Sequence, residues 1–408
     1  MWSRKCKGRK TLHLDAGSSS ARHSYRQIGG EAMTRAAGTF LLALAVLATG
    51  ASAGQFKKAA YYRAGMLPSQ VVTGDLNNDG NVDLAFADWL SNQLVILLGN
   101  GDGTFQEPIT IRAPSPTSLA VGDLDGDGNL DLAVVESGGS GSGALAVYLG
   151  EGNGKFHLKA TYRLGAHAGV VTVADFNGDG HLDVAVGDEG KGSSGVVRIF
   201  LGTGKGTLRK PTTYKVGAWL GLMAAGDLNG DHFPDLAVTG PMDGSVVVFL
   251  NDGTGKFLKP VTYNAGGGEV VDVKIADLRN DGRNDLVIAN LSQGMVVLLN
   301  QGNGTFGKPA IYRPCAGQCS AGPTACAVAD FSLKGKLDVA CSASIDDSYL
   351  FYGKGDGTFG LAIAIADTIK NQGGFSIAAG NFITNSKTPD LAIPIEEYGK
   401  VAIMINTQ

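Results

Sequence analysis

The stretch Gly74-Asp75-Leu76-Asn77-Asn78-Asp79-Gly80-Asn81-Val82-Asp83 decides the fold, because it recurs along the chain. An apolar segment, an acidic turn and a second apolar segment follow one another about every 50 residues, seven times in all. The clearest further copies run over 123–131 and 175–183. In these copies side-chain oxygens occupy turn positions one, three, five and nine, and glycine occupies position six. Ca²⁺ prefers oxygen ligands and glycine permits the sharp bend, so the turn predicts a calcium site.

The second unit of the repeat predicts four short strands, at 118–121, 132–135, 145–149 and 157–162. Short β-prone segments at regular spacing, punctuated by turn residues, are typical of an all-β repeat. Four antiparallel strands within about 50 residues make one propeller blade. A fixed period also means that each unit buries its apolar faces by stacking on its neighbours.

A second turn, with the pattern Gly-x-Gly-x-Phe, follows the third predicted strand of most units. It occurs at 101–105, 152–156, 253–257, 302–306 and 355–359, and with leucine in place of phenylalanine at 204–208. The glycines provide positive-φ positions. We expect the phenylalanine to be a core anchor between blades.

The two ends of the repeat predict a closed ring. The last unit stops at a third strand, 401–406, whereas 54–63 matches the turn and fourth strand of the other units. The N-terminal strand should therefore complete the last blade, which leaves no free edge. The prediction is a single all-β domain over 54–408, a seven-bladed β-propeller of four-stranded antiparallel blades.

The first 53 residues lie outside the repeat. Residues 33–53 combine a charged start, an apolar run at 40–48 and Ala51-Ser52-Ala53, which indicates a signal peptide cleaved after Ala53. The apolar run is too short to span a bilayer, so no membrane span is expected in the mature chain. Residues 1–32 are interpreted as a non-native or disordered extension, and the alternative is an unusually long targeting leader. The predicted location is secreted, periplasmic or on the cell surface.

Charge and cysteine content narrow the function classes. Without residues 1–53 the chain keeps 26 basic and 36 acidic residues of the 34 and 38 in the whole, so its formal charge becomes −10 instead of −4. This acidic balance argues against nucleic-acid binding. Outside the leader lie Cys315, Cys319, Cys326 and Cys341. In an exported protein they predict disulfides Cys315–Cys319 and Cys326–Cys341, with a zinc site as the competing interpretation.

The acidic turn together with the Gly-x-Gly-x-Phe turn resembles the FG-GAP or VCBS repeats, which form the seven-bladed propeller of integrin α subunits and occur in many exported bacterial proteins. The resemblance covers 54–408. In such repeats, turn positions one, three, five and nine supply side-chain oxygens and position seven a backbone carbonyl. The implied ligands in the first four blades are Asp75, Asn77, Asp79, Asn81 and Asp83; Asp123, Asp125, Asp127, Asn129 and Asp131; Asp175, Asn177, Asp179, His181 and Asp183; and Asp227, Asn229, Asp231, Phe233 and Asp235.

The later copies depart from this pattern. The fifth blade offers Asp277, Asp281 and Asp285, but Arg279 stands at position three. In the sixth, Lys334 occupies position five, where its ammonium could replace the metal, and the seventh carries an inserted residue. In the fourth, His232 replaces the glycine. We expect about four structural Ca²⁺ sites, a compromised fifth and none in the last two blades, and the competing explanation is that Asp-Gly sequences simply form turns.

Both turns lie at one end of each blade, so partners are expected at the opposite rim. Its candidate aromatic residues are Trp89, Trp219, Phe375 and Tyr398, and its candidate acids are Glu136, Asp188, Glu189, Asp243, Asp346, Asp347, Glu396 and Glu397. Alternatively, each aromatic residue packs under its own loop. No recognisable catalytic motif occurs, so an enzyme is not expected. The predicted function is a calcium-stabilised module for protein recognition or adhesion, and the alternative is a carbohydrate-binding or carbohydrate-active propeller, a lectin or a polysaccharide lyase.

Overall fold

The computed structural model describes residues 55–137, 143–165, 168–188, 195–216, 220–240, 244–314, 322–343, 348–365, 376–395 and 398–408. The expected signal peptide, the preceding extension, Cys315, Cys319, Trp219, Phe375 and the acids Glu189, Asp243, Asp346, Asp347, Glu396 and Glu397 lie outside these residues. The chain divides into two units, 1–49 and 50–408, and only the second contains described residues. The described part of the second unit is all β and has no α-helix. It therefore has no helix that is long and apolar enough to cross a membrane.

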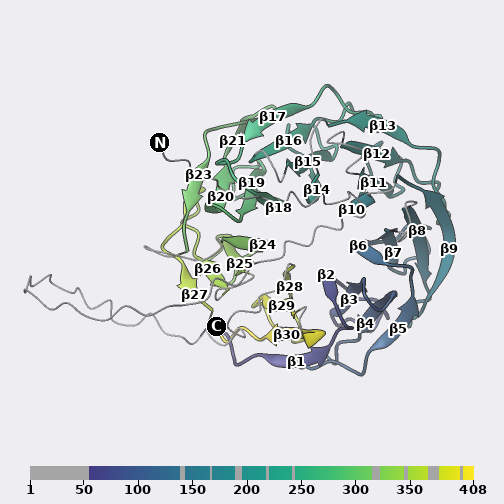
Figure 1. Ribbon diagram of the computed structural model, residues 1–408. Helices are drawn as coiled ribbons and strands as arrows, with labels where there is room; N and C mark the ends of the chain where they lie inside the picture. Colours follow the sequence, from purple (N-terminus) through teal and green to yellow (C-terminus); the bar gives the residue numbers. More distant parts are fainter. Residues whose placement is uncertain are drawn as a thin grey trace, which may run out of the picture. The chain divides into compact units, whose positions relative to one another are not determined.

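Seven four-stranded antiparallel sheets form a ring, as predicted (Figure 1). The strands of blades one to four are β2 (Pro68–Gly74), β3 (Asp83–Asp88), β4 (Gln93–Leu97), β5 (Ile109–Arg112); β6 (Pro116–Gly122), β7 (Asp131–Glu136), β8 (Ala144–Gly150), β9 (Phe156–Arg163); β10 (Ala168–Ala174), β11 (Asp183–Asp188), β12 (Val196–Phe200), β13 (Thr212–Lys215); and β14 (Met223–Gly226), β15 (Asp235–Gly240), β16 (Ser245–Phe249), β17 (Val261–Asn264).

Blades five and six are built from β18 (Val270–Ala276), β19 (Asp285–Asn290), β20 (Gly294–Leu298), β23 (Ala310–Tyr312), and from β24 (Pro323–Ala329), β25 (Asp338–Ala343), β26 (Tyr349–Phe351), β27 (Ile363–Ala364). In blade five a small hairpin of β21 (Asn300–Gly302) and β22 (Thr305–Phe306) forms the second turn. The first strand of each blade lies innermost and the fourth outermost (Figure 1).

The seventh blade closes the ring in the expected way. Its first three strands are β28 (Ala378–Gly380), β29 (Asp390–Ile395) and β30 (Lys400–Met404). Its fourth is β1 (Ala60–Arg63) from the other end of the described chain, which pairs antiparallel with β30 (Figure 1). Ala60 lies opposite Ile403 and Arg63 opposite Lys400.

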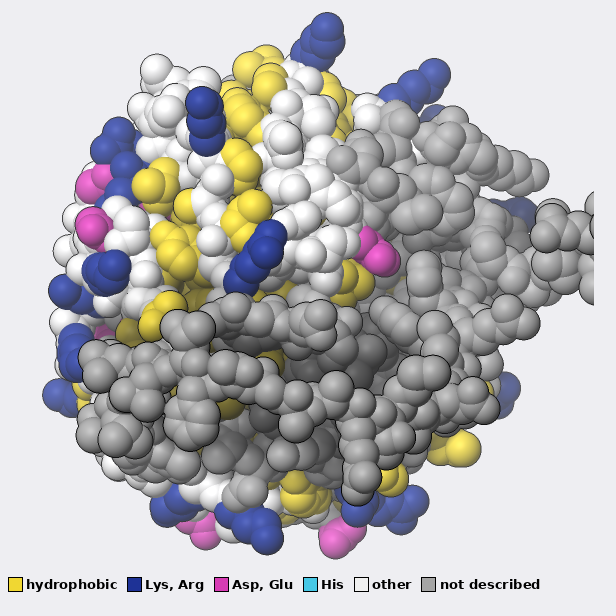
Figure 2. All heavy atoms as spheres, turned by 60° about the vertical axis from the view of Figure 1, so that its left-hand side comes forward, with side chains coloured by type: hydrophobic (Ala, Val, Ile, Leu, Met, Phe, Trp, Pro, Cys, Tyr) yellow, Lys and Arg dark blue, Asp and Glu magenta, His cyan; other side chains and the backbone are white. Residues whose placement is uncertain are grey.

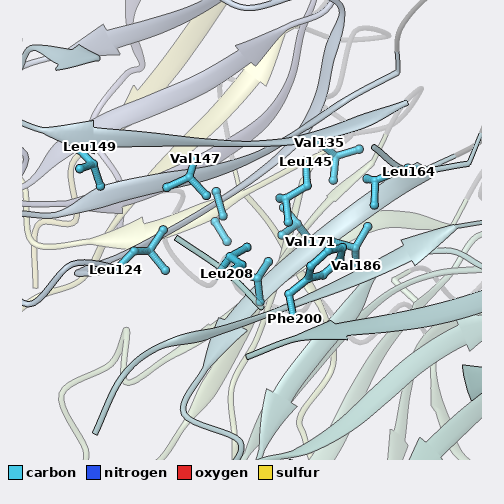
Figure 3. Packing of buried hydrophobic residues seen from close by; sticks show 14 residues of the cluster. Leu124, Val135, Leu145, Val147, Leu149, Leu164, Val171, Val186, Phe200 and Leu208 are labelled. Carbon is cyan, nitrogen blue, oxygen red and sulfur yellow. The ribbon is translucent and has the colours of Figure 1, made fainter. Parts of the chain in front are cut away.

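The core lies between blades rather than within one layer. The described residues form seven apolar clusters, and each joins two neighbouring blades. Between blades two and three, Val135 and Leu145 face Val171, Val186 and Phe200 (Figure 3). Each interface therefore depends on both of its blades, as expected for stacked repeats.

The phenylalanine of the second turn is a core anchor between blades, as predicted. Phe257 is 8% exposed, and its ring lies edge-on to Tyr214 from the outer strand of the preceding blade, with 5.7 Å between centroids. The Tyr214 hydroxyl accepts a hydrogen bond from the Phe257 backbone N–H at 3.0 Å. Truncation of such a ring to alanine typically costs about 3–5 kcal/mol.

The predicted disulfide between Cys326 and Cys341 is present, with a Cα–Cα distance of 4.1 Å. The two residues are directly opposed in β24 and β25 of blade six, where both side chains are buried in the cluster shared with blade five. Two of the four thiols are thus engaged in this bond and not in a zinc site.

Candidate metal-binding turns

The acidic turns owe their shape to hydrogen bonds that the turn makes with itself. In blade one, the Asp75 carboxylate at position one accepts the N–H of Asp79 at 3.1 Å and of Gly80 at 2.9 Å. Gly80 has φ of 83°, a value that a residue with a side chain rarely adopts. Blades two and three repeat this arrangement, with Gly128 and Gly180 at φ of 88° and 81°. These hydrogen bonds curl the turn around the carboxylate at position one.

The same turn forms in blade four although His232 stands in place of the glycine. His232 adopts φ of 71°, and its N–H reaches the Asp227 carboxylate at 2.9 Å, like that of Gly80 in blade one. Its imidazole Nδ1 lies 3.8 Å from the same carboxylate. A side chain in the left-handed region costs on the order of 1 kcal/mol. The substitution thus strains the turn but leaves its geometry intact.

Position nine is aspartate in all seven blades, and this carboxylate is buried in each. Asp83 accepts the N–H of Leu76 on one oxygen and of Gly99 on the other, both at 2.7 Å. Asp131, Asp183 and Asp235 make the equivalent pair of bonds. Each carboxylate thus ties its own turn to the end of the third strand.

Asp338 and Asp390, in the two blades where no metal is expected, accept the same kind of N–H pair. The faithful repetition of aspartate at position nine therefore has a structural cause that is independent of any cation. The sequence pattern alone does not distinguish this structural role from metal binding, because both require an ionised carboxylate at position nine. Each oxygen keeps a further lone pair with which to bind a cation.

Burial shifts the protonation of these carboxyl groups. Desolvation raises the pKa of Asp83, Asp131, Asp183 and Asp235 to about 6, and the nearby turn carboxylates add to the effect. The N–H donors act in the opposite direction. A cation bound beside these groups would relieve the repulsion, because it favours the ionised form.

The donor set of blade two fits one hard cation. Oxygens of Asp123, Asp125 and Asp131 all lie within 4.8 Å of one another. Ca²⁺ binds oxygen at about 2.4 Å, so two ligands on the same ion are at most about 4.8 Å apart. The structure thus brings together three of the implied ligands of this blade.

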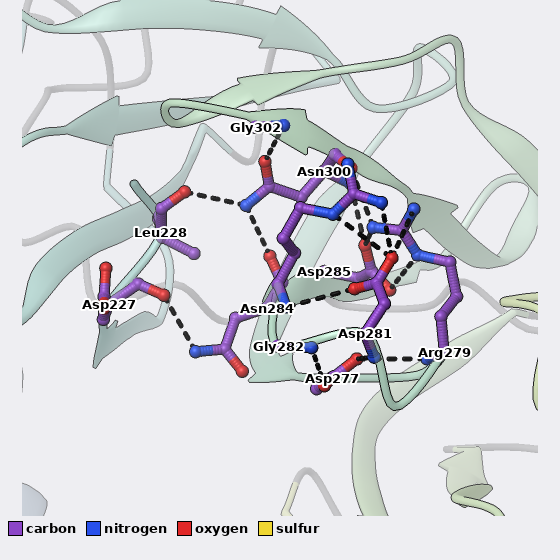
Figure 4. A network of polar contacts seen from close by, with 11 residues as sticks. Asp227, Leu228, Asp277, Arg279, Asp281, Gly282, Asn284, Asp285, Asn300 and Gly302 are labelled. Carbon is purple, nitrogen blue, oxygen red and sulfur yellow. Dashed lines mark hydrogen bonds and ion pairs between the residues drawn. The ribbon is translucent and has the colours of Figure 1, made fainter. Parts of the chain in front are cut away.

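In blade five a side-chain cation takes this place (Figure 4). The Arg279 guanidinium donates to Asp285 at 2.8 and 3.2 Å and pairs with Asp281 at 3.2 Å. It also donates to the Asn300 carbonyl at 2.7 Å. Arg279 therefore joins positions five and nine with its own charge.

Blade six differs again. The Lys334 ammonium lies 5.7 Å from the centre of the Tyr352 ring, and it forms no ion pair with any residue of the described ranges. The ammonium that could have replaced the metal through a salt bridge therefore makes none within the described ranges. The aromatic ring is nearer to the end of the lysine side chain, and its face attracts a cation.

These turns also connect neighbouring blades. The Leu76 carbonyl at position two accepts the N–H of Gly154 from the next blade at 3.0 Å. The Asn251 side-chain amide reaches the Phe176 carbonyl at 2.6 Å, and Asn300 and Asn406 make the equivalent bonds to Leu228 and Phe331. The acidic end is thus a bonded network around the ring, a role that the sequence pattern did not reveal.

Comparison with protein families matches five overlapping copies of the FG-GAP-like repeat, at residues 75–134, 133–186, 175–238, 227–288 and 277–341. The chain belongs to the FG-GAP-like repeat family. The matched copies extend from the first acidic turn to the second strand of blade six. The expected membership in this family is therefore confirmed.

Several solved structures share the propeller fold. The chain is similar to BBS1N, solved in complex with ARL6DN and soaked with mercury, at 14% identity and a TM-score of 0.59, with 87% of this chain and 98% of that chain covered. The lead-soaked crystal of the same complex gives 13% identity and a TM-score of 0.60 over the same shares. A lectin from Agrocybe aegerita that recognises non-reducing terminal N-acetylglucosamine is 20% identical, with a TM-score of 0.55 over 83% of this chain and 86% of that chain. No curated protein matches the sequence.

At the rim opposite the acidic turns, the aromatic candidates Trp89 and Tyr398 both lie in loops between second and third strands. Tyr398 is 51% exposed. Trp89 is half-buried and donates its indole N–H to the Ser137 hydroxyl of the next blade at 3.4 Å. Trp89 is thus partly a packing residue, as the alternative interpretation held, whereas Tyr398 presents half of its surface to solvent.

Two of the acids expected at this rim are not surface groups. Glu136 is 7% and Asp188 1% exposed. Tyr148 donates its hydroxyl to Glu136 at 2.9 Å, and Arg198 pairs with Asp188 at 2.5 Å. Burial raises the pKa of Glu136. These acids end their strands facing inward and link strands within their own blades, so the expectation that they line a binding surface is wrong.

Proposed function

We propose that this FG-GAP-like propeller is an exported protein-recognition module. In this proposal calcium has a structural role in the turns of blades one to four, and partners bind at the opposite rim, without catalysis. The observation that supports it is an exposed apolar cluster of Met66, Leu90 and Tyr398, which are 63%, 46% and 51% exposed. We call these three residues the rim cluster.

Three loops bring the rim cluster together. The Asp88 carboxylate accepts the N–H of Met66 at 3.0 Å and of Leu67 at 2.9 Å, which holds the loop before β2 against the turn that carries Leu90. The Gly399 carbonyl accepts the Ala64 N–H at 2.9 Å, which places the Tyr398 loop beside the same segment. Apolar and aromatic side chains on loops anchored in this way are typical of protein-binding surfaces.

Met66 and Leu90 were not predicted as surface residues for binding, because single apolar residues in loops are common and carry no motif. Their proximity to Tyr398 depends on the ring closure, which sets blade seven beside blade one. The available signal was that both residues are apolar and fall between predicted strands.

The acidic turns support the structural part of the proposal. Their carboxylates are fixed by backbone N–H groups, and in blade five the Arg279 guanidinium supplies a positive charge among the same positions. A bound cation would do the same for blades one to four. A second candidate function is glycan binding, favoured by the likeness to the Agrocybe aegerita lectin.

A photo-crosslinking amino acid at Leu90 tests the proposal against the extracellular proteins of the source organism, with calcium or chelator present. The matched control places it at Leu361, which is 90% exposed on the outer segment of blade six. We expect a discrete adduct from Leu90 that is absent from Leu361 and is lost with Tyr398→Glu. Binding on a glycan array without such an adduct would support the second candidate instead. Absence of both the adduct and glycan binding would overturn both candidate functions.

A further inference from the structure

Taken together, the outermost segments of the blades carry charge of essentially one sign. These segments run from the anchor of the second turn to the end of the fourth strand: 56–63, 105–112, 156–163, 208–215, 257–264, 306–313 and 359–365. They contain twelve Lys or Arg residues and one acidic residue, Glu107, in a chain whose formal net charge is −4. We call the twelve basic residues the cationic belt. In Figure 2 Lys and Arg side chains project from the described surface, and Asp and Glu side chains are sparse.

The belt is built on a repeated position after the anchor. The second residue beyond the anchor is Lys58, Lys210, Lys259 or Lys308 in four of the segments, and all four are exposed. In the last three a proline follows, which fixes the backbone where the outer strand begins. These blades thus carry an exposed lysine at the same place, just before the outer strand.

A second repeated position ends the outer strand. Alternate residues of a strand point to opposite sides. Tyr62, for example, faces inward onto Phe105, with ring centroids 5.4 Å apart, and the next residue, Arg63, is exposed. Arg112, Arg163, Lys215 and Arg313 hold the equivalent place and are also exposed. The inward aromatic contact therefore fixes the outward direction of the basic residue.

These basic side chains are available to a partner. Within the described ranges none of the twelve forms an ion pair. Arg313 alone has a side-chain hydrogen bond to a described residue, to the Gln293 amide oxygen at 3.2 Å. Most of the acidic residues beyond residue 53 lie instead in the two turns at one end of the blades.

Protection of edge strands accounts for part of this pattern, because lysine and proline on an outer strand discourage pairing with another sheet. Protection of the edge strands alone does not require one sign of charge, since acidic side chains on the outer strands of two copies would repel each other equally well. The excess of twelve to one in an acidic chain needs a further cause. Attraction of a polyanion provides it.

We infer that the cationic belt binds a flexible anionic polysaccharide, a chain that bears carboxylate or sulfate groups. Blades seven, one, two and three, which are consecutive around the ring, hold nine of the twelve basic residues. A thin, flexible chain can follow this convex arc, whereas a flat membrane would touch only a short part of it. Single-stranded nucleic acid needs a series of exposed aromatic rings for stacking. Of the six tyrosines in these segments only Tyr61 is exposed, at 37%, and the other five are turned onto neighbouring rings: Tyr62, Tyr162, Tyr214, Tyr263 and Tyr312.

The test measures binding of the full chain to immobilised alginate and heparin at 50 and 300 mM NaCl, with neutral dextran as the baseline. The belt variant combines Lys58→Gln, Arg63→Gln, Lys210→Gln and Lys215→Gln. We expect binding by the unchanged chain to fall steeply with salt, as for any multivalent ionic contact, and the variant to bind at least about tenfold more weakly at low salt.

The matched control removes the same charge from Lys155, Lys205, Lys256 and Lys354, four exposed lysines of the second turns, again by substitution with glutamine. It should bind within about twofold of the unchanged chain, and the thermal midpoints of all three proteins should agree. Equal losses in both variants, or no binding to either polysaccharide, would overturn the inference. Stronger binding to oligo(dT) or to phosphatidylserine vesicles than to both polysaccharides would also overturn it.

Discussion

The acidic turns of blades two and five solve one electrostatic problem in two ways. Both carry carboxylates at positions one, five and nine, of which the first is half-buried, the second exposed and the third buried. In blade two, Asp123, Asp125 and Asp131 converge without a partner cation among the described side chains. In blade five the Arg279 guanidinium joins Asp281 and Asp285. The comparison shows that a side-chain cation can join these carboxylates in blade five. In the proposed calcium-bound state of blade two, an ion would take the same place.

Removal of calcium should have the largest effect. At a hundredfold excess over its dissociation constant, each occupied site stabilises the fold by about 2.7 kcal/mol. With several such sites, a chelator should lower the melting temperature by on the order of 10 °C and leave a folded propeller. Differential scanning calorimetry with and without EDTA measures this shift.

Calorimetric titration assigns the effect to particular blades. Asp127→Ala should reduce the calcium stoichiometry by one, whereas Asp356→Asn, an exposed acid of the second turn in blade six, should leave it unchanged. Absence of calcium binding by the unchanged chain near neutral pH would refute the metal interpretation.

Loss of the position-nine carboxylate should distinguish the two turns in chelator. Asp285→Ala leaves two N–H donors unpaired and removes the buried carboxylate partner of the Arg279 guanidinium, which keeps only Asp281 and the Asn300 carbonyl, for a cost of about 3–5 kcal/mol. Asp131→Ala frees only N–H donors and should cost about 2–3 kcal/mol. Urea denaturation compares the two variants. An equal cost would show that Arg279 does not depend on Asp285.

Arg279→Asn should convert the fifth turn to the chemistry of the first. The substitution reproduces the pattern of Asp75, Asn77, Asp79 and Asp83. Without calcium it should lose about 2 kcal/mol, because the carboxylates lose their charge partner. With calcium the stoichiometry should rise by one, and Arg279→Lys serves as the variant that keeps the charge and gains no site. A stoichiometry that does not change would show that the charge alone does not decide which turns bind metal.

His232→Gly tests the strained copy. Glycine adopts φ of 71° without a steric penalty, so the variant should gain up to about 1 kcal/mol. The matched change Gly128→Ala, at φ of 88° in blade two, should lose a similar amount. Melting temperatures in chelator report both, and a loss in the histidine variant would indicate that its imidazole stabilises Asp227.

Glu136→Gln extends the comparison to a buried carboxyl group that has one hydroxyl partner instead of two N–H donors. Burial raises its pKa, so its contribution to stability decreases as pH rises from the unfolded pKa through the folded one. Glutamine removes this loss. The melting temperature of the variant relative to the unchanged chain should therefore increase by about 1–2 °C between pH 4.5 and pH 7.5. A difference that is constant with pH would contradict this explanation.

The ring was predictable from the sequence because its signals are local and repeated. Strand, turn and strand recur with glycines at the places where the backbone needs positive φ, and seven copies reinforce one interpretation. The buried contact of Phe257 with Tyr214 follows from the same repetition. The closure by β1 was also within reach, since the incomplete last unit lacked one strand.

The surfaces were less predictable because they depend on contacts between distant residues. Glu136 and Asp188 read as solvent-facing acids, yet each ends a buried strand and pairs inward. Met66 and Tyr398 are far apart in sequence and meet only through the closure. The end of Lys334 lies by an aromatic ring that no spacing rule places beside it.

The pairing of β1 with β30 has a consequence for synthesis of the protein. The first strand of the described chain leaves the ribosome long before its partner, with some 340 residues between them. At about 5–20 residues per second, this interval is roughly 20–70 s. During that time blade seven is incomplete, and blade one and the most recently formed blade each present an unsealed flank. The nascent chain must therefore remain soluble as an incomplete arc, and β30 acts as the latch that ends this vulnerable period.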